Sequence, residues 1–108
     1  MSLASDIVIV SIACGSQSEA DAISRHLVEQ RLAACVQSHP ITSTYHWQGE
    51  IETANEIMLT AKTLTFKLEA LETMVRQHHS YEVPEILATP ATWVSESYAQ
   101  WLRESLQS

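Results

Sequence analysis

Apolar residues follow one another closely near the start of the chain and then change to a helical spacing. From Ile7 to Cys14 nearly every residue is apolar and many are β-branched, which favours a strand in the middle of a sheet or covered on both faces. A stripe at intervals of three and four residues follows and predicts an amphipathic helix. The stripe consists of Ala20, Ile23 and Leu27. The helix can begin at either of two capping boxes. These are Ser16 with Glu19 and Ser18 with Asp21.

The middle of the chain has the pattern of strands. A short strand is predicted from Ala33 to Gln37, and Pro40 after it is expected to break regular pairing at a bulge or an edge. Ile41 to Gln48 and Glu50 to Thr63 are interpreted as the arms of a hairpin that turns around Gln48-Gly49. A typical strand has about 5–6 residues, so these arms are expected to overhang a small sheet and leave backbone groups that need partners.

A helix, a strand and a short helix are predicted in the last third. The first helix spans about Thr65 to His78 and has a second apolar stripe. That stripe consists of Leu64, Leu68, Leu71 and Val75. Val83-Pro84 ends helical structure and leads into a strand from Glu85 to Thr89. Ser95 is expected to cap the C-terminal helix.

The order of these elements is strand, helix, strand, strand, helix, strand, with a short helix at the end. It predicts an α+β fold of the ferredoxin-like split βαβ type, in which right-handed crossovers place both main helices on one face of an antiparallel sheet. With 108 residues and 45% apolar content, the whole sequence 1–108 is expected to form a single domain.

Charge and cysteine content narrow the possible partners and compartment. The chain has 13 acidic and 6 basic residues, and a formal net charge of -7 argues against binding to nucleic acid or to an anionic membrane. The longest apolar run is far shorter than a span of about 20 residues, and no basic leader precedes it. Two distant cysteines are typical of reduced thiols. We therefore expect a soluble, cytoplasmic protein.

Strand directions determine which reactive groups can meet. Cys14 ends an upward strand, whereas Cys35 begins one, so the two lie roughly 15–20 Å apart at about 3.3 Å per residue. A disulfide between them within one chain is excluded, because it needs α-carbons within about 7 Å. The second helix climbs to the same end as Cys14, and so does the hairpin. The polar residues expected at that end are His39, His46, His78, His79, Tyr81 and Glu82. Thiolate, imidazole and carboxylate groups together favour a soft to borderline metal such as copper or zinc.

Motifs between Arg31 and Ile86 closely resemble those of the CutA family of divalent-cation tolerance proteins. They are the run Arg31–Val36, then Pro40, Ser43, Tyr45, Trp47, Gly49, Glu56, Lys62-Thr63 and the segment His79–Ile86. The likeness extends over nearly the whole chain. It implies the same fold, assembled as a homotrimer in which the long hairpin arms extend sheets between subunits. It also implies copper binding, with Cys14, His78 and His79 as metal ligands.

The chain departs from the family pattern at three places. Ser80 stands where the family usually has proline between histidine and tyrosine, Gln37 stands where asparagine commonly follows Cys-Val, and the loop before Tyr98 lacks the usual glycine. Loss of the proline is expected to loosen the turn that orients His79 and Tyr81.

Structural roles compete with metal binding at several of these residues. A cysteine in an apolar strand is more often a small core residue than a ligand, which applies to Cys14 and more strongly to Cys35. His79 can instead hydrogen-bond the chain reversal before the last strand. Glu56 and Lys62 are expected to form a cross-strand or intersubunit salt bridge rather than to act in catalysis.

Enzymatic and RNA-binding functions of the same fold fit poorly. No strand has the aromatic-rich signature of an RNA-recognition motif. The loop after the first strand has no arginine, and Glu19 and Asp21 would repel the phosphate that an acylphosphatase binds. We therefore expect a non-enzyme. The first hypothesis is a trimer of metal-ion homeostasis. The alternative is a signalling trimer similar to PII proteins, which bind effectors between subunits. Its cleft would be lined by Arg31, Glu56, Lys62 and Tyr81.

Overall fold

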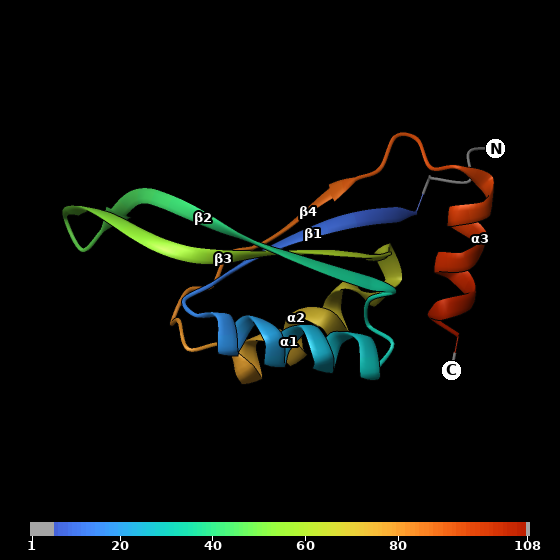
Figure 1. Cartoon of the computed structure of the whole chain (residues 1–108), viewed down its shortest axis with the longest axis horizontal. Helices are drawn as coiled ribbons and strands as arrows, with labels where there is room; N and C mark the ends of the chain where they lie inside the picture. Colours follow the sequence, from blue (N-terminus) through green and yellow to red (C-terminus); the bar gives the residue numbers. More distant parts are fainter. Residues whose placement is uncertain (1–5, 108) are drawn as a thin grey trace.

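The computed structural model describes residues 6–107 and consists of four strands and three α-helices, with one short 3-10 turn. Figure 1 shows them in chain order. The elements are β1 (Ile7–Cys14), α1 (Gln17–Glu29), β2 (Cys35–Trp47), β3 (Glu50–Leu64), η1 (Thr65–Lys67), α2 (Leu68–His78), β4 (Ile86–Pro90) and α3 (Glu96–Ser105). None of the helices in this range has the length and apolar content of a membrane-spanning segment.

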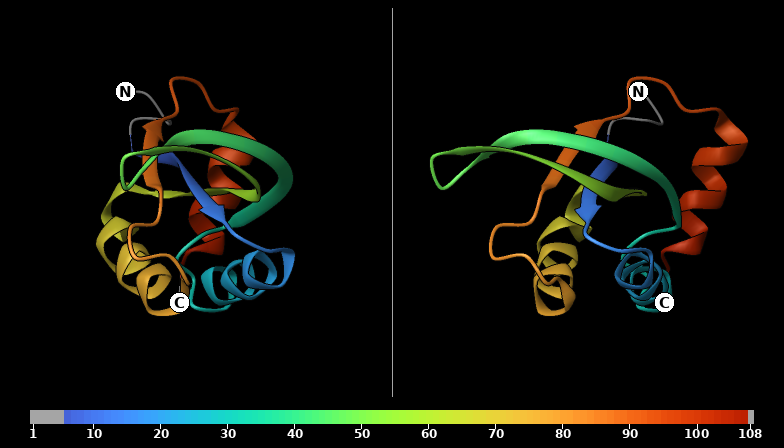
Figure 2. Two further views of the ribbon diagram at one scale, coloured as in Figure 1. Left: turned by 90° about the vertical axis from the view of Figure 1, so that its left-hand side faces the viewer. Right: turned by 60° about the vertical axis from the view of Figure 1, so that its left-hand side comes forward.

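The strands form one antiparallel sheet in the order β2-β3-β1-β4. α1 and α2 lie side by side under one face of it, and α3 packs at one end (Figures 1 and 2). The predicted α+β class and element order are confirmed. β1 is a central strand, and Val10 and Ile12 on it are fully buried, as its continuous apolar run predicted.

The long hairpin is more regular than the sequence suggested. Strands β2 and β3 pair without interruption from Cys35 opposite Lys62 to Trp47 opposite Glu50. The expected break at Pro40 is wrong, because Pro40 pairs with Ile57 inside this continuous register, but its expected position at an edge is confirmed. A proline is tolerated there because β2 is an edge strand, on which an N–H can face away from the sheet.

The hairpin turns at the predicted two residues. Gln48 has φ 51° and Gly49 has φ 82°, which is the left-handed pair that a type I′ turn requires. β1 reaches along β3 only as far as residue Ile57, so the hairpin beyond this point is a two-stranded ribbon. The ribbon projects to the left in Figure 1 and gives the molecule dimensions of 46 × 26 × 22 Å. The predicted overhang is confirmed.

Two apolar clusters hold the chain together. The larger lies between the sheet and the helices α1 and α2, and includes fully buried Ile12, Ile23, Leu27, Leu71 and Val75. The smaller lies under α3 at the opposite end from the ribbon. Its buried members are Ile7, Leu64, Ala99, Leu102 and Leu106. Both helical stripes therefore face the interior.

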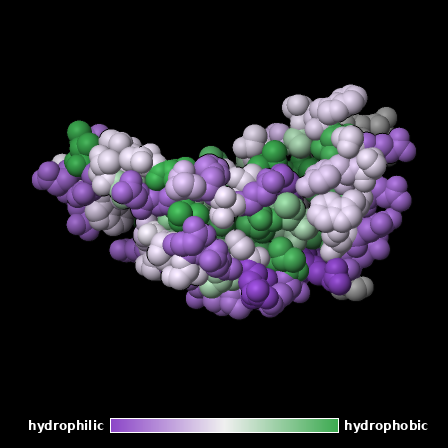
Figure 3. Space-filling model, in the orientation of Figure 1, coloured by the Kyte–Doolittle hydropathy of each residue, from purple (hydrophilic) through white to green (hydrophobic). Residues whose placement is uncertain are grey.

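Helix caps follow the sequence signals. The Ser16 side chain accepts a hydrogen bond from the backbone N–H of Glu19 and is therefore the N-cap of α1. The Glu19 side chain bonds to the Ser80 N–H, so the reciprocal bond of a capping box is not made. Ser95 caps α3 by accepting from the N–H of Tyr98. On the face drawn in Figure 3, the margin formed by the helices is mostly hydrophilic, whereas apolar residues reach the surface at the end of the ribbon.

Candidate metal site

Cys14, Glu19 and His79 converge at the end of the sheet where β1 finishes. Each offers one possible ligand atom, and these atoms all lie within 4.8 Å of one another. Cys14 is the last residue of β1 and is fully buried. Glu19 is in the first turn of α1, and His79 directly follows α2 with extended backbone angles of φ -90° and ψ 137°. Strand directions thus brought Cys14 and His79 to one end, as expected.

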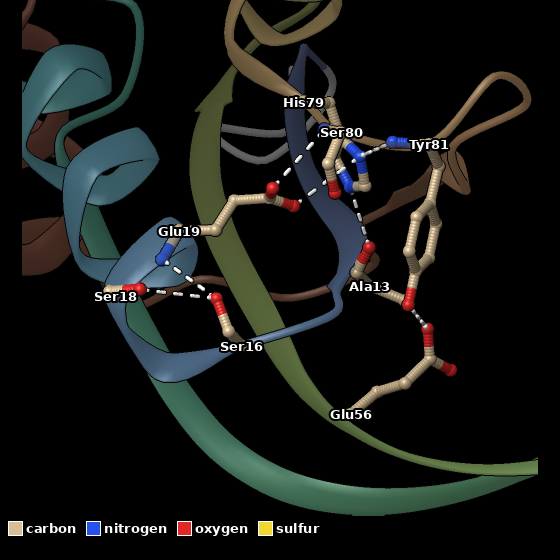
Figure 4. Close-up of polar contacts among 8 residues, drawn as sticks. All are labelled: Ala13, Ser16, Ser18, Glu19, Glu56, His79, Ser80 and Tyr81. Carbon is tan, nitrogen blue, oxygen red and sulfur yellow. Dashed lines mark hydrogen bonds and ion pairs between the residues drawn. The ribbon is translucent and has the colours of Figure 1, made fainter.

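The His79 ring is fully buried and both of its nitrogens have partners (Figure 4). Nε2 lies 2.7 Å from the carbonyl oxygen of Ala13. A carbonyl can only accept, so Nε2 must be the protonated nitrogen. Nδ1 lies 3.1 Å from the backbone N–H of Tyr81 and accepts from it. These contacts select the neutral tautomer, whose Nδ1 lone pair points toward the segment that follows α2.

The Glu19 carboxylate reaches from α1 to the same segment. Its Oε2 accepts a hydrogen bond of 3.1 Å from the backbone N–H of Ser80. Its Oε1 is buried with no hydrogen-bond partner among residues 6–107, and lies 3.5 Å from Nδ1 of His79. An anionic oxygen and a ring lone pair thus face each other across a water-excluded gap. Nδ1 is satisfied by the Tyr81 N–H, but the buried Oε1 costs free energy unless a proton or a cation satisfies it.

Ser80 supplies a donor that proline cannot. A proline at this position has no N–H, so the hydrogen bond to Glu19 exists only because Ser80 stands there. The expectation that this replacement loosens the turn is therefore incomplete. The turn is tied to α1 by Glu19, and His79 is tied to β1 by Ala13.

The Cys14 thiol is held in its neutral form. Burial raises its pKa to about 12, and the charges of Glu19 and Glu56 act in the same direction. Binding of a metal by the sulfur therefore requires the ion to displace a proton. A thiol with this environment is a poor nucleophile but remains a strong ligand once ionised by a metal.

Tyr81 and Glu56 form the polar wall next to this cluster. The Tyr81 hydroxyl donates a 2.7 Å hydrogen bond to Oε2 of Glu56. Glu56 is itself buried and only 7% exposed. Burial, and then the bond to Glu56, raise the pKa of Tyr81. A Cβ at Gly15 would lie 3.0 Å from the Tyr81 oxygen, so glycine is needed for this close approach. A groove of about 760 Å³ opens beside the pair. Its walls include Tyr45, Trp47, Glu56, Tyr81, Glu82 and Glu85.

Other histidines named from the sequence lie elsewhere. The Nδ1 of His78 bonds to the carbonyl of Met74, and its ring stacks on His26 of α1 rather than joining the buried cluster. Adjacent helical residues point about 100° apart, which separates His78 from His79. His39 and His46 are exposed on β2.

The residues of the alternative effector cleft do not lie together, because Arg31 and Lys62 are at the Cys35 end of the sheet and Glu56 and Tyr81 are at the Cys14 end. Cys35 pairs with Lys62 at the far end of the sheet, and both cysteines are free, as the topology required. Lys62 donates to Gln37 at 2.6 Å, and Arg31 donates to the carbonyl of Ser105 at 2.8 Å. The ion pairs among residues 6–107 include neither Glu56 nor Lys62, so the cross-strand alternative is wrong, whereas the intersubunit salt bridge stays a prediction.

Glu19 is the site residue that sequence reasoning missed. It was assigned to a capping box, in which its side chain would return to the helix start, and to a loop that repels phosphate. The available signal was the very short connection between β1 and α1, which consists of Gly15 and Ser16. A connection of this length places the first turn of α1 beside Cys14, so any acidic residue there can reach the thiol.

Residues 8–105 match the CutA1 divalent ion tolerance protein family. The chain belongs to this family. It is 43% identical over 98 residues to the divalent-cation tolerance protein CutA of Thermus thermophilus, covering 90% of this chain and 95% of that protein. It is 41% identical over 98 residues to human protein CutA, covering 90% of this chain but only 55% of the human protein.

Solved structures agree with the fold over almost the whole length. CutA from Xylella fastidiosa superposes with a TM-score of 0.92 at 38% identity, covering 95% of this chain and all (100%) of that chain. A protein from Archaeoglobus fulgidus, described as a periplasmic divalent cation tolerance protein, has a TM-score of 0.92 at 34% identity. The superposition covers 94% of this chain and 99% of that protein. The likeness extends beyond the local motifs to the sheet and all three helices.

Proposed function

We propose that this protein binds copper or a similar divalent cation and acts in metal-ion homeostasis. The observation that carries the proposal is the buried Oε1 of Glu19, which lacks a hydrogen-bond partner and faces Nδ1 of His79 at 3.5 Å. The Cys14 sulfur belongs to the same cluster. A cation there would satisfy the Glu19 oxygen, and its binding would require the Cys14 thiol to lose a proton and Nδ1 of His79 to give up its bond from the Tyr81 N–H.

The donor set suits a borderline metal. Thiolate, imidazole and carboxylate together are typical ligands of copper and zinc rather than of magnesium or calcium. We put Glu19 in place of His78 in the ligand set, because Glu19 joins Cys14 and His79 in the buried cluster, whereas the His78 ring lies outside it against His26. The Ser80 N–H would hold Glu19 in position as an outer-shell partner. Neither catalysis nor a substrate is part of this proposal.

A titration with copper tests the ligand set. Cys14→Ser and Glu19→Gln are each expected to weaken Cu²⁺ binding at least about tenfold, and Cys14→Ser should remove any thiolate-to-copper absorption. Cys35→Ser is the matched control, because that thiol lies at the other end of the sheet. Loss of copper binding in the Cys35 variant alone would contradict the proposal, because it would show that the site lies at the Cys35 end of the sheet. Equal copper binding in all variants would contradict the proposed site and indicate adventitious coordination at the surface.

We further propose that the protein is a homotrimer in the cytoplasm. The projecting ribbon leaves free strand edges, and its exposed residues Tyr45, Trp47 and Ile51 provide apolar area that a neighbouring copy can cover. The two free thiols are compatible with a reducing compartment. Light scattering should give about three times the chain mass of 12.1 kDa. A stable monomer at micromolar concentration would contradict the assembly.

The groove of about 760 Å³ beside Tyr81 favours a second candidate, an effector-binding trimer similar to PII proteins. Arg31 and Lys62 lie away from Tyr81 and Glu56 in one chain, so such a cleft would need residues from neighbouring subunits. Calorimetry with nucleotides and simple anions, without added metal, tests it. Nucleotide binding that survives Cys14→Ser would favour the effector role over the metal role.

A further inference from the structure

His26 and His78 form a pair of imidazoles across the two helices, outside the buried cluster. His26 is on α1 and His78 ends α2, and their ring centroids are 4.2 Å apart with an interplanar angle of 35°. His78 is exposed and His26 is half-buried, so water reaches the pair. Among residues 6–107 no hydrogen bond holds the His26 ring, so none would have to break if the ring turned.

The His78 ring is oriented as a metal ligand requires. Its Nδ1 lies 2.9 Å from the carbonyl oxygen of Met74, and since that oxygen can only accept, Nδ1 must carry the proton. Nε2 then has the free lone pair. Metal-binding histidines in general donate their other ring N–H to a backbone carbonyl or carboxylate, which fixes the tautomer and the ring direction.

The spacing of the rings allows both to bind one ion. Two imidazole nitrogens that share an ion at about 2 Å from each lie about 3 Å apart. Rings whose centroids are separated by 4.2 Å reach this spacing by rotation of the unrestrained His26 ring. We infer that His26 and His78 form a second, surface metal site, which takes a late first-row divalent ion such as Ni²⁺ or Cu²⁺ through two imidazoles and completes its coordination with water.

This site differs from the buried cluster in chemistry and in location. It contains no thiol and no carboxylate, so it selects ions by their affinity for imidazole. The buried His79 ring instead bonds to Ala13 on the sheet side. An ion held by both histidines would link α1 to α2, because each ring belongs to a different helix. It would therefore stabilise the folded chain by mass action.

Nickel titration of the intact protein tests the pair. Paramagnetic Ni²⁺ should broaden the ring NMR signals of His26 and His78 before those of His39, His46 and His79. Ni²⁺ should also raise the melting temperature. His26→Gln should lower Ni²⁺ affinity at least about tenfold. The matched control His46→Gln, on the exposed ribbon, should leave it unchanged.

The test separates this site from the proposed copper cluster. Cys14→Ser should abolish the thiolate signal with copper but leave Ni²⁺ binding at the pair intact. His26→Gln should do the reverse. Unchanged Ni²⁺ affinity in His26→Gln, or broadening that begins at His39, His46 or His79, would overturn the assignment. Because the broadening pattern is read on the unaltered protein, the result does not depend on how any variant folds.

Discussion

The two ends of the sheet differ in whether polar or apolar groups lie in the interior. At the end where β1 finishes, polar groups lie inside: the His79 ring is fully buried and Glu19 has a buried oxygen without a hydrogen-bond partner. At the other end, apolar residues such as Leu102 fill the interior under α3. The charges there lie outside, where Arg103 forms a bidentate pair with Asp6 at 2.6 and 2.9 Å.

This difference separates stability from function along the molecule. Burial of an unpartnered polar group costs free energy, so an end that keeps one is not optimised for stability alone. The end under α3 has no such group among the described residues. Changes under α3 should therefore affect folding, whereas changes around Cys14 should affect ligand binding and pH dependence more than folding.

Truncation of the α3 cluster should have the largest effect. Leu102 is fully buried, so Leu102→Ala should lower the free energy of unfolding by about 2–5 kcal/mol through lost burial and a cavity. Urea denaturation at one fixed protein concentration measures this, since association shifts apparent stability. The exposed Gln107→Ala is the control. Copper affinity of the folded fraction should not change, and a large loss of affinity would show that the two ends are coupled.

Alkaline pH should lower the stability of the protein through Cys14, at the end of the sheet opposite α3. The pKa of Cys14 is raised from 9.0 to about 12, so above pH 9 the unfolded chain loses a proton that the folded chain keeps. Stability is therefore unaffected below pH 9 and falls as pH rises toward 12, by about 1 kcal/mol between pH 8 and pH 10. Unfolding curves over this range should be less pH-dependent in Cys14→Ala. An unchanged slope in that variant would show that the thiol is not protected.

Glu19→Gln should separate stability from binding in a single residue. The amide removes the buried charge while its oxygen can still accept from the Ser80 N–H, so the apo protein should gain about 1 kcal/mol of stability. The same change should weaken copper binding. Glu69→Gln, at an exposed position in the first turn of α2, serves as the control. A clear loss of apo stability would mean that Glu19 is structural.

The exposed ion pair between Asp6 and Arg103 should contribute least to the free energy of unfolding. Asp6 is 44% exposed, so the Coulomb attraction is screened and Asp6→Asn should cost about 0.5 kcal/mol at neutral pH. The bond to Arg103 lowers the pKa of Asp6 below 3.8. This contribution is therefore present above pH 3.8 and lost as pH falls through the folded-state value. Acid titration of both proteins should converge below that point, and a constant difference would point to packing instead.

The sequence predicts directions of elements better than directions of side chains. The alternation of strands and helices was enough to place Cys14 and His79 at one end and Cys35 at the other. It was not enough to orient adjacent His78 and His79, because a final helical turn separates neighbours by about 100°. Glu19 was missed because a capping signal explained it fully. Burial and hydrogen-bond partners, which depend on tertiary packing, distinguish these cases.

The error at Pro40 has a similar cause. Proline disrupts pairing only where its missing N–H would face a partner strand, and the sequence does not reveal which strands are at an edge. The proposed trimer would likewise depend on further copies of the chain, although the overhang of the ribbon was foreseeable from its length. Local patterns therefore predicted most of the fold and, in the candidate metal site, Cys14 and His79 but not Glu19.

The unbroken pairing of β2 with β3 limits how this hairpin can change over evolutionary time. Side chains alternate between the two faces along each strand, and no bulge interrupts the register to absorb an added residue. One residue inserted into a single arm would exchange the faces of all positions on one side of it. Descendants of this sequence should therefore lengthen or shorten the ribbon by two residues in each arm, and natural variation in its reach should come in steps rather than continuously.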